Sequence, residues 1–416
     1  MTKLDDQIAR NRKELERHPP EDTGRAVALY SLAASLRDKF SETNDVADLE
    51  ETLALHQSAL DLRPPGHSNR SDSLHFVALC FSDRYNKQGT IADLEEAIKL
   101  GRAALELRSP GHPDRAFTLY NLAFDLRNRF LKSGANDDLD EAISLHRSAL
   151  DLRPPGHSNR SDSLHYLALC FSDRYNKQGT IADLEEAITL GRAALELRSP
   201  GHSGRAVTLY NLAFDLRTRF LKFGANGDLD EAISLHQSAL DLHPLGHSNR
   251  SDSLHSMALC FSDRYNKQST TADLEEAITL GRAALELRSP GHFGRAFTLY
   301  NLACDLRKRF LKFGANDDLD EAISLHRSAL DLRPPGHSDR SSSLHNLALC
   351  FSDRYDKQDI IADLEEAITL GRAASELRSL GHSGRAFTLY NLACDLRKRF
   401  LKFGANDDLD EAISLH

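Results

Sequence analysis

The sequence predicts an all-α protein, an α-solenoid of antiparallel helix pairs with a 45-residue repeat. Three observations predict this fold. One arginine recurs every 45 residues from Arg25 to Arg385, an Asp-Leu pair such as Asp138-Leu139 recurs in phase with it, and two apolar stripes of helical spacing lie between these markers. Alternate repeats match best, so the duplicated module is 90 residues long. Helix pairs of this kind bury their apolar faces only against neighbouring pairs, which gives a solenoid and not separate globules.

The first helix of each repeat is predicted from a single apolar stripe. In one copy the stripe consists of Leu119, Leu122, Ala123, Leu126 and Phe130, at positions i, i+3, i+4, i+7 and i+11. This spacing places all five side chains on one face of a helix with 3.6 residues per turn. The alanine is kept in every repeat. Its small side chain allows a neighbouring helix to approach closely.

The second helix is predicted to open at an aspartate such as Asp138, with Glu141 three residues later. This is the spacing of a capping box, in which the two acidic side chains satisfy first-turn N–H groups. We expect the helix to stop at Arg153, because Pro154 cannot continue it and Gly156 is able to take a positive φ. The apolar stripe of this helix consists of Leu139, Ala142, Ile143, Ala149, Leu150 and Leu152.

Residues 1–20 are predicted to form an N-terminal capping half-repeat helix. They align with a second helix alone, in which Leu4 and Ile8 keep the apolar stripe while Arg10 and Glu14 replace apolar residues on its outer side. A charged outer face is what the exposed end of a solenoid requires.

Residues 21–416 are predicted to form nine repeats, of which the last is incomplete. The sequence stops at His416, where the preceding copies continue their second helix. We therefore expect the chain to be truncated relative to its ancestor, or to be a fragment of a longer multidomain protein. The uncapped apolar face at this end predicts that self-association is possible.

Composition excludes several classes of protein. The chain of 416 residues carries 52 basic and 62 acidic side chains, a net charge of −10, without a concentrated basic block, which argues against a nucleic-acid binder. No stretch approaches the ~20 apolar residues of a membrane-spanning helix, and the charged start is unlike a secretory signal. The six cysteines form no Cys-x-x-Cys pair, as expected of a reduced protein in the cytoplasm.

No enzyme signature is present, so neither a catalytic residue nor a cofactor is predicted. The sequence contains no phosphate-binding Gly-rich loop ending in Lys-Ser/Thr, no His-Glu-x-x-His and no Gly-x-Ser-x-Gly. Nineteen histidines are spread singly along the repeats, which does not favour a metal site built from three or four converging ligands. The histidines of the second helices, such as His146, alternate with glycines such as Gly101, and this large/small alternation is expected to serve helix packing.

The repeat resembles the tetratricopeptide repeat (TPR) at Leu119-Tyr120-Asn121-Leu122-Ala123, Asp140-Glu141-Ala142-Ile143 and Ala149 to Pro154. The chain departs from the family in its period, 45 residues against the usual 34. The resemblance implies a right-handed superhelix and a non-catalytic scaffold that binds a protein or peptide partner in its concave groove.

The long repeat is most similar to the kinesin-light-chain branch and to long fungal arrays, which are often joined to a CHAT peptidase or a nucleotide-binding switch domain. The Asn-Leu-Ala core and the connector Gly111-His112-Pro113-Asp114-Arg115 carry this likeness. It implies an alternative function, in which the chain is the sensor or regulatory arm of a larger signalling protein whose effector domain lies outside the given sequence.

The candidate partner-binding residues are outward positions of the first helices, which line the concave face in the related repeats. An aromatic or imidazole ring follows the invariant leucine at Tyr120, His165, Tyr210, His255, Tyr300 and Tyr390. Amides and guanidinium groups follow at Asn121, Asn211, Asn301, Asn346, Asn391, Arg127, Arg217 and Arg307.

These residue types suit peptide recognition. The resemblance implies that the asparagines bond to a peptide main chain, for which an amide offers both a donor and an acceptor. Arginine offers bidentate contact to acidic side chains, and tyrosine offers a large contact area. The alternative is a merely solvated inner face, on which pairs such as Asp72 and His75 satisfy one another.

Overall fold

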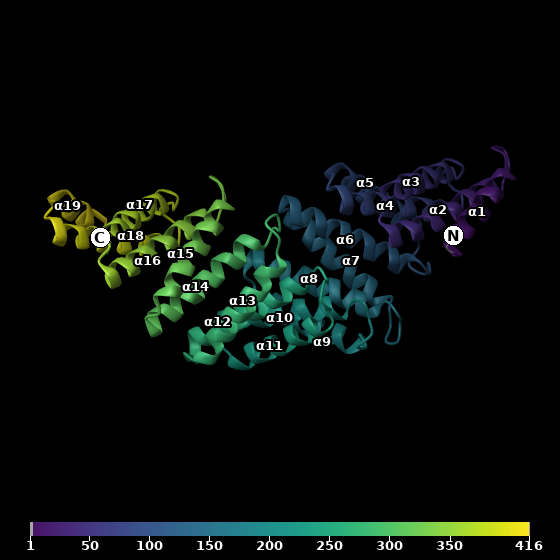
Figure 1. Ribbon diagram of the computed structural model, residues 1–416. Coiled ribbons are helices and arrows are strands. Elements are labelled where there is room, and N and C mark those ends of the chain that lie inside the picture. Colours follow the sequence, from purple (N-terminus) through teal and green to yellow (C-terminus); the bar gives the residue numbers. More distant parts are fainter. Residues whose placement is uncertain (1–2, 416) are drawn as a thin grey trace. The chain divides into compact units, whose positions relative to one another are not determined.

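The computed structural model describes residues 3–415, so the ends of the two predicted regions, at residues 1–2 and 416, lie outside the described residues. Every regular element among the described residues is an α-helix (Figure 1). The first helices of the repeats are α2 (Arg25–Thr43), α4 (Arg70–Gln88), α6 (Arg115–Ser133), α8 (Arg160–Gln178), α10 (Arg205–Phe223), α12 (Arg250–Gln268), α14 (Arg295–Phe313), α16 (Arg340–Gln358) and α18 (Arg385–Phe403). The second helices are α3 (Val46–Asp61), α5 (Ile91–Leu107), α7 (Asn136–Asp151), α9 (Ile181–Leu197), α11 (Asn226–Asp241), α13 (Thr271–Leu287), α15 (Asn316–Asp331), α17 (Ile361–Glu376) and α19 (Asn406–Leu415).

The chain divides into two compact parts, an N-terminal half up to Thr208 and a C-terminal half from Leu209. Each helix packs on its neighbours in the sequence, from α1 to α9 in the N-terminal half and from α11 to α19 in the C-terminal half. Buried leucine, isoleucine, alanine and phenylalanine side chains form a continuous row of apolar clusters between the paired helices. Leu122, Ala123 and Leu126 of the predicted stripe are almost completely buried. The predicted all-α solenoid of helix pairs is confirmed.

One helix precedes the nine pairs. Helix α1 (Lys3–Glu16) places Ile8 in an apolar cluster with Leu32 and Leu36 of α2, and Leu4 and Leu15 pack against this cluster. Its polar side chains include Arg10 and Glu14, which are exposed. This is the division of faces that the sequence predicts for a capping helix.

The predicted start of the second helices is wrong by two residues. Helix α7 begins at Asn136, so Asp138 already lies within the first turn and is not the capping residue. Its carboxylate accepts two hydrogen bonds from Arg129, with Nε–Oδ2 at 2.7 Å and Nη2–Oδ1 at 2.6 Å. The recurring aspartate therefore joins the second helix to the end of the first helix of the same repeat. A bidentate salt bridge and a helix cap both use an aspartate at this place, so the spacing alone does not separate the two roles.

A buried arginine follows each second helix and holds the connector to the next repeat. Arg153 is 2% exposed, and its Nη1 donates to the carbonyl of Asn159 at 3.1 Å and to Oγ of Ser163 at 2.8 Å. Its guanidinium carbon lies 5.0 Å from the ring centroid of Tyr120. This side chain, which the sequence predicts only as the end of the second helix, joins three segments of the chain. Six further copies make the same Nη1 contacts, at Arg63, Arg108, Arg198, Arg288, Arg333 and Arg378.

The arginine that marks the 45-residue period completes this connection. Arg160 opens α8 and donates from Nη1 to the carbonyl of Arg153 at 2.5 Å. Between the two arginines the chain reverses at Gly156, whose φ of 92° is a conformation that other residues rarely adopt. We call the pair of arginines and its acceptors the connector latch. The buried arginine is replaced at two copies, by His18 after the capping helix and by His243 between two repeats.

Among residues 3–415, no helix is long and apolar enough to cross a lipid bilayer.

Replacing Arg153 with methionine is expected to destabilise the protein by about 2–3 kcal/mol, because the carbonyl of Asn159 and the hydroxyl of Ser163 lose a buried donor. The converse change, His243→Arg, is expected to stabilise it by about 1 kcal/mol by restoring these bonds to residues 249 and 253. Urea denaturation followed by circular dichroism measures both free energies. Opposite signs are predicted, and two changes of the same sign would contradict the role given to the latch.

Candidate functional site

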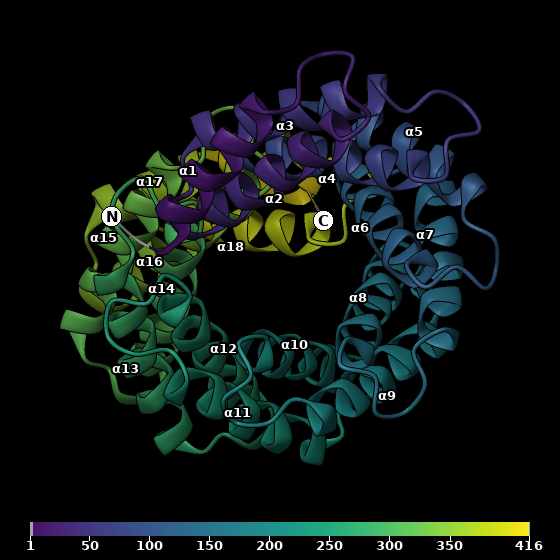
Figure 2. The ribbon, with the colours of Figure 1, turned by 90° about the vertical axis from the view of Figure 1, so that its right-hand side faces the viewer.

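The first helices lie on the inner side of each half. In the N-terminal half, Cα atoms of α4 and α6 come within 8 Å of one another, as do those of α6 and α8. In the C-terminal half, the same close approach is found between α12 and α14, between α14 and α16, and between α16 and α18. No two second helices within either half come as close among the described residues. The first helices therefore form the concave side, which the view along each half also shows (Figure 2).

The predicted tyrosines belong to clusters of rings. Tyr120 makes edge contacts with His146 and with Tyr166, at centroid distances of 5.5 and 5.4 Å. His146 is fully buried, and neither of its nitrogens has a hydrogen-bond partner. Burial lowers the pKa of His146 to about 3, so the ring is neutral and packs as an aromatic side chain. Tyr210 and Tyr300 contact His236 and His326 in the same way, whereas Tyr390 is exposed.

The predicted histidines of the first helices are buried and not free on the inner surface. His165 and His255 are 5% and 6% exposed. Nδ1 of His165 lies 3.3 Å from Oγ1 of Thr208. The pairing of Asp72 with His75, which belonged to the alternative of a solvated inner face, is not formed: the Asp72 carboxylate accepts a hydrogen bond from Nη2 of Arg108 at 2.6 Å, and Nδ1 of His75 lies 3.5 Å from Oγ1 of Thr118. The buried arginine attracts the carboxylate more strongly than a neutral imidazole does.

The predicted asparagines lie at partly buried positions of the first helices. Asn121 and Asn301 each donate from Nδ2 to the carbonyl four residues earlier, Phe117 and Phe297, at 2.8 Å. Asn391 makes the same bond to Phe387 at 2.7 Å. Asn211 is also engaged by a polar or ionic contact. Each of these three bonds, at Asn121, Asn301 and Asn391, uses one of the two amide N–H groups.

Asn346 differs from the other asparagines, because it donates to the hydroxyl of Tyr300 at 2.8 Å. It also donates to the carbonyl of Ser342 at 3.0 Å. Both of its N–H groups therefore have acceptors in the chain.

The predicted arginines are joined to aspartates on the next first helix. Nε of Arg127 donates to Oδ2 of Asp173 at 2.6 Å, and both side chains are largely buried. Arg217 and Arg307 make the same ion pair with Asp263 and Asp353. Sequence reasoning missed these aspartates, although they recur in every second repeat at a fixed distance from the arginine.

The serines that alternate with these arginines make a related contact. Oγ of Ser82 donates to Oδ1 of Asp125 at 2.5 Å, and Ser262 and Ser352 repeat this bond to Asp305 and Asp395. Burial raises the pKa of Asp125 to about 7. Successive first helices are therefore tied together on the concave side by an Arg–Asp pair and a Ser–Asp pair in turn.

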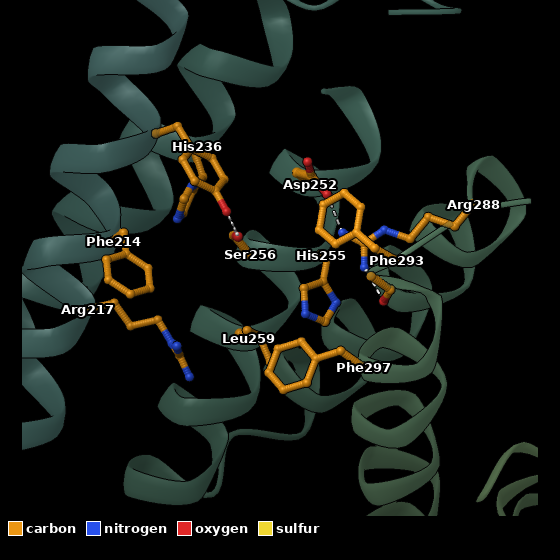
Figure 3. A pocket seen from close by; sticks show the side chains of 12 residues that line it. Phe214, Arg217, His236, Asp252, His255, Ser256, Leu259, Arg288, Phe293 and Phe297 are labelled. Carbon is orange, nitrogen blue, oxygen red and sulfur yellow. Dashed lines mark hydrogen bonds and ion pairs between the residues drawn. The ribbon is translucent and has the colours of Figure 1, made fainter. Parts of the chain in front are cut away.

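One cavity opens on the concave side of the C-terminal half, with a volume of about 300 Å³ (Figure 3). It is lined mainly by apolar and aromatic surface, and its floor includes His236 and Ser256. Phe293 and Phe297 stand at its margin and are 90% and 46% exposed. Sequence reasoning missed this cavity, although residue 256 is a visible signal, because a bulky ring stands at the same position in two other copies.

One group of possible metal ligands is present among the described residues. Ligand atoms of Asp72, His112 and Asp114 lie within 4.8 Å of one another. The Asp72 carboxylate already accepts from Arg108, and Nδ1 of His112 accepts from the backbone N–H of Asp114 at 3.2 Å. Two of the three groups thus have roles in the connector.

Comparisons with known proteins identify the class of fold. No protein-family model and no curated protein matches the sequence. Among solved structures, a signal transduction ATPase with numerous domains from Pyrococcus horikoshii, described as having a tetratricopeptide repeat sensor, is 12% identical with a TM-score of 0.58. The match covers 95% of this chain and 52% of that one.

Two further structures are similar to the chain. The quorum sensor NprR from B. thuringiensis is 18% identical, with a TM-score of 0.52, over 90% of this chain and 94% of that one. A putative kinesin light chain of Podosopora anserina, with nearly identical TPR-like repeats, is 22% identical over 52% of this chain and 96% of that one, with a TM-score of 0.37. The chain has the fold of the tetratricopeptide-repeat proteins, as the sequence predicts.

The buried imidazoles predict how stability depends on pH. The unfolded chain binds a proton at each histidine below a pH of about 6.5, whereas folded His146 binds one only near pH 3. Its contribution to stability is therefore present above pH 6.5 and is lost as the pH falls towards 3. Asp125 acts in the opposite direction, because its raised pKa favours the folded state at acid pH and that contribution is lost as the pH rises through 7.

Substitution of His146 with glutamine is expected to weaken the pH dependence of unfolding. Between pH 7 and pH 5, the free energy of unfolding of the wild type should fall by about 2 kcal/mol more than that of the variant. The reason is that the variant lacks the imidazole and takes up one proton fewer when it unfolds. Urea denaturation at the two pH values measures the difference. Equal losses for the two proteins would show that His146 is protonated, or exposed, in the folded state.

Proposed function

We propose that the protein is a non-catalytic scaffold of the cytoplasm that binds a segment of a protein or peptide partner along the concave side of its first helices. The repeated display of tyrosine, asparagine and arginine on that side is the observation that carries the proposal. The same positions recur at intervals of 90 residues, so an extended segment meets equivalent groups several times. Several weak contacts held at fixed spacing together bind a flexible chain more tightly than any one of them does.

The geometry supports a surface that is already ordered before it binds. The Arg127–Asp173 and Ser82–Asp125 contacts tie first helices together, and rings such as Tyr120 pack against buried His146. A side chain held in one conformation loses less entropy on binding than a free one. Asn121 and Asn301 use one N–H group internally, which fixes the amide and leaves the second N–H for a partner.

An alternative function is the sensor or regulatory arm of a larger signalling protein, with a CHAT peptidase or a nucleotide-binding switch as its effector. The likeness to the Pyrococcus horikoshii protein favours this alternative, because that protein is described as having a tetratricopeptide repeat sensor and the match spans about half of its chain. Sequencing of the transcript beyond the codon of His416 tests it directly. A continuous downstream frame that encodes neither effector domain would overturn it.

Replacement of Asn121, Asn211 and Asn301 with alanine is expected to reduce capture of partner peptides at least tenfold, because three amide contacts to the peptide main chain are lost. An array of unrelated 12-residue peptides, probed with the purified chain, measures capture.

The matched control is the triple replacement of Thr189, Thr279 and Thr369 with alanine. These threonines lie exposed on second helices and donate to the carbonyl four residues earlier, as the asparagines do, but on the opposite side of the array. The control should bind as the wild type does. Unchanged capture by the asparagine variant, with its helix content intact, would count against the proposed surface.

A further inference from the structure

The cavity around Ser256 has a counterpart 90 residues earlier, and in that counterpart a ring fills the space. Tyr166 stands where Ser256 does in the later copy. The centroid of the Tyr166 ring lies 5.4 Å from Tyr120, 5.5 Å from Phe124, 6.1 Å from His146 and 5.2 Å from His165. The residues 90 positions after these four are Tyr210, Phe214, His236 and His255, and all of them line the cavity (Figure 3).

The two remaining copies of this position are also filled. Phe76 stacks on His56 with a centroid distance of 5.4 Å. Asn346 reaches the hydroxyl of Tyr300 with its amide at 2.8 Å. Ser256 is the shortest side chain of the four, and its Oγ donates to the hydroxyl of Tyr210 at 3.1 Å. The cavity therefore results from a change of side chain within a scaffold of unchanged rings.

Two further departures from the repeat accompany Ser256, and one of them, Phe293, lines the cavity. His243 replaces the latch arginine, which covers the ring of Tyr120 and the ring of Tyr300 at 5.0 Å in the neighbouring copies. Phe293 stands where other connectors have Pro113, Ser203 or Ser383, and it is 90% exposed at the margin of the cavity. A large apolar side chain at an open rim adds contact area for an entering group.

We propose that this cavity binds one aromatic side chain, tyrosine or phenylalanine, of the partner segment. The inference rests on the proposed function and adds a specificity site to it. The entering ring lies against His236 as Tyr166 lies against His146, with edge contacts to Tyr210 and Phe214. Both edge and stacked contacts are favoured arrangements for aromatic pairs.

The charge of the site agrees with this occupant. Burial lowers the pKa of His236 and of His255 to about 3, so both imidazoles are neutral at physiological pH. The two cations at the cavity are already paired, Arg217 with Asp263 and Arg288 with Asp252. A neutral ring therefore suits the cavity better than a charged group does.

The test uses 4-fluorophenol as a stand-in for the tyrosine side chain, with binding followed by the line width of its fluorine resonance. The wild type should bind one molecule, and p-cresol should displace it more effectively than 4-methylcyclohexanol does. Ser256→Tyr should bind at least tenfold more weakly, because its own ring fills the cavity. Ser256→Ala keeps the space and serves as the matched control. Tyr166→Ser should gain a second site of the same kind.

The outcomes separate this inference from the proposed function. The aromatic site is overturned if 4-fluorophenol does not bind to the wild type, or if it binds equally well to Ser256→Tyr. Neither result contradicts the proposed function, which the peptide array tests separately. On that array, peptides lost by Ser256→Tyr but kept by Ser256→Ala should contain tyrosine or phenylalanine. Loss of peptides irrespective of their aromatic content also overturns the inference. Binding of 4-fluorophenol with no captured peptide overturns the proposed function and leaves the aromatic site.

Discussion

The structure depends on a buried guanidinium group, which is present at every junction between repeats except the one that holds His243. A helix pair alone exposes one apolar face, and the next pair covers it only if the chain returns at the correct angle. Arg153 sets this return, because one guanidinium group reaches the connector and the following first helix, and Arg160 bonds back to its carbonyl. The cation lies among carbonyl and hydroxyl dipoles and over a ring, so it is satisfied although it is almost inaccessible to water.

Most of the fold could be predicted from the sequence, and the reason is the repetition. The stripe of Leu122, Ala123 and Leu126 is copied so often that chance agreement is excluded, and nearest-neighbour packing follows from it. The helix starts could not be predicted in the same way. Asp138 has the position of a cap and the role of a salt-bridge partner, and only the place of Arg129 on another helix decides between them.

The candidate site was predicted less completely than the fold. The ladder of tyrosine, asparagine and arginine was found because these residues recur, and the structure places the first helices that carry it on the concave side. Their partners could not be read from spacing along the chain. Arg127 meets Asp173, and Tyr120 meets Tyr166, across 46 residues, a distance that becomes a contact only after two helices have packed. The burial of His165 has the same origin.

The cavity illustrates a different use of repetition. In a chain of near-identical modules, a position that departs from its copies is informative because the surroundings are held constant. Ser256 and Phe293 depart from their copies at one set of rings that is otherwise unchanged, and His243 departs in the connector that precedes Ser256. In the copy 90 residues earlier, the ring of Tyr166 fills the space and packs against Tyr120 and His146. That copy therefore shows that an aromatic ring fits among these side chains.

The central claim is that each repeat is stabilised only by its neighbours through stacked faces and the connector latch. Deletion of residues 61–150 tests it most directly, because this removes one 90-residue module and joins Leu60 to Asp151, the copy of Asp61. The account predicts a folded chain with an unchanged fraction of helix and protected amides in every remaining pair by hydrogen exchange. A shortened chain that unfolds, or that loses protection in pairs distant from the join, would contradict it.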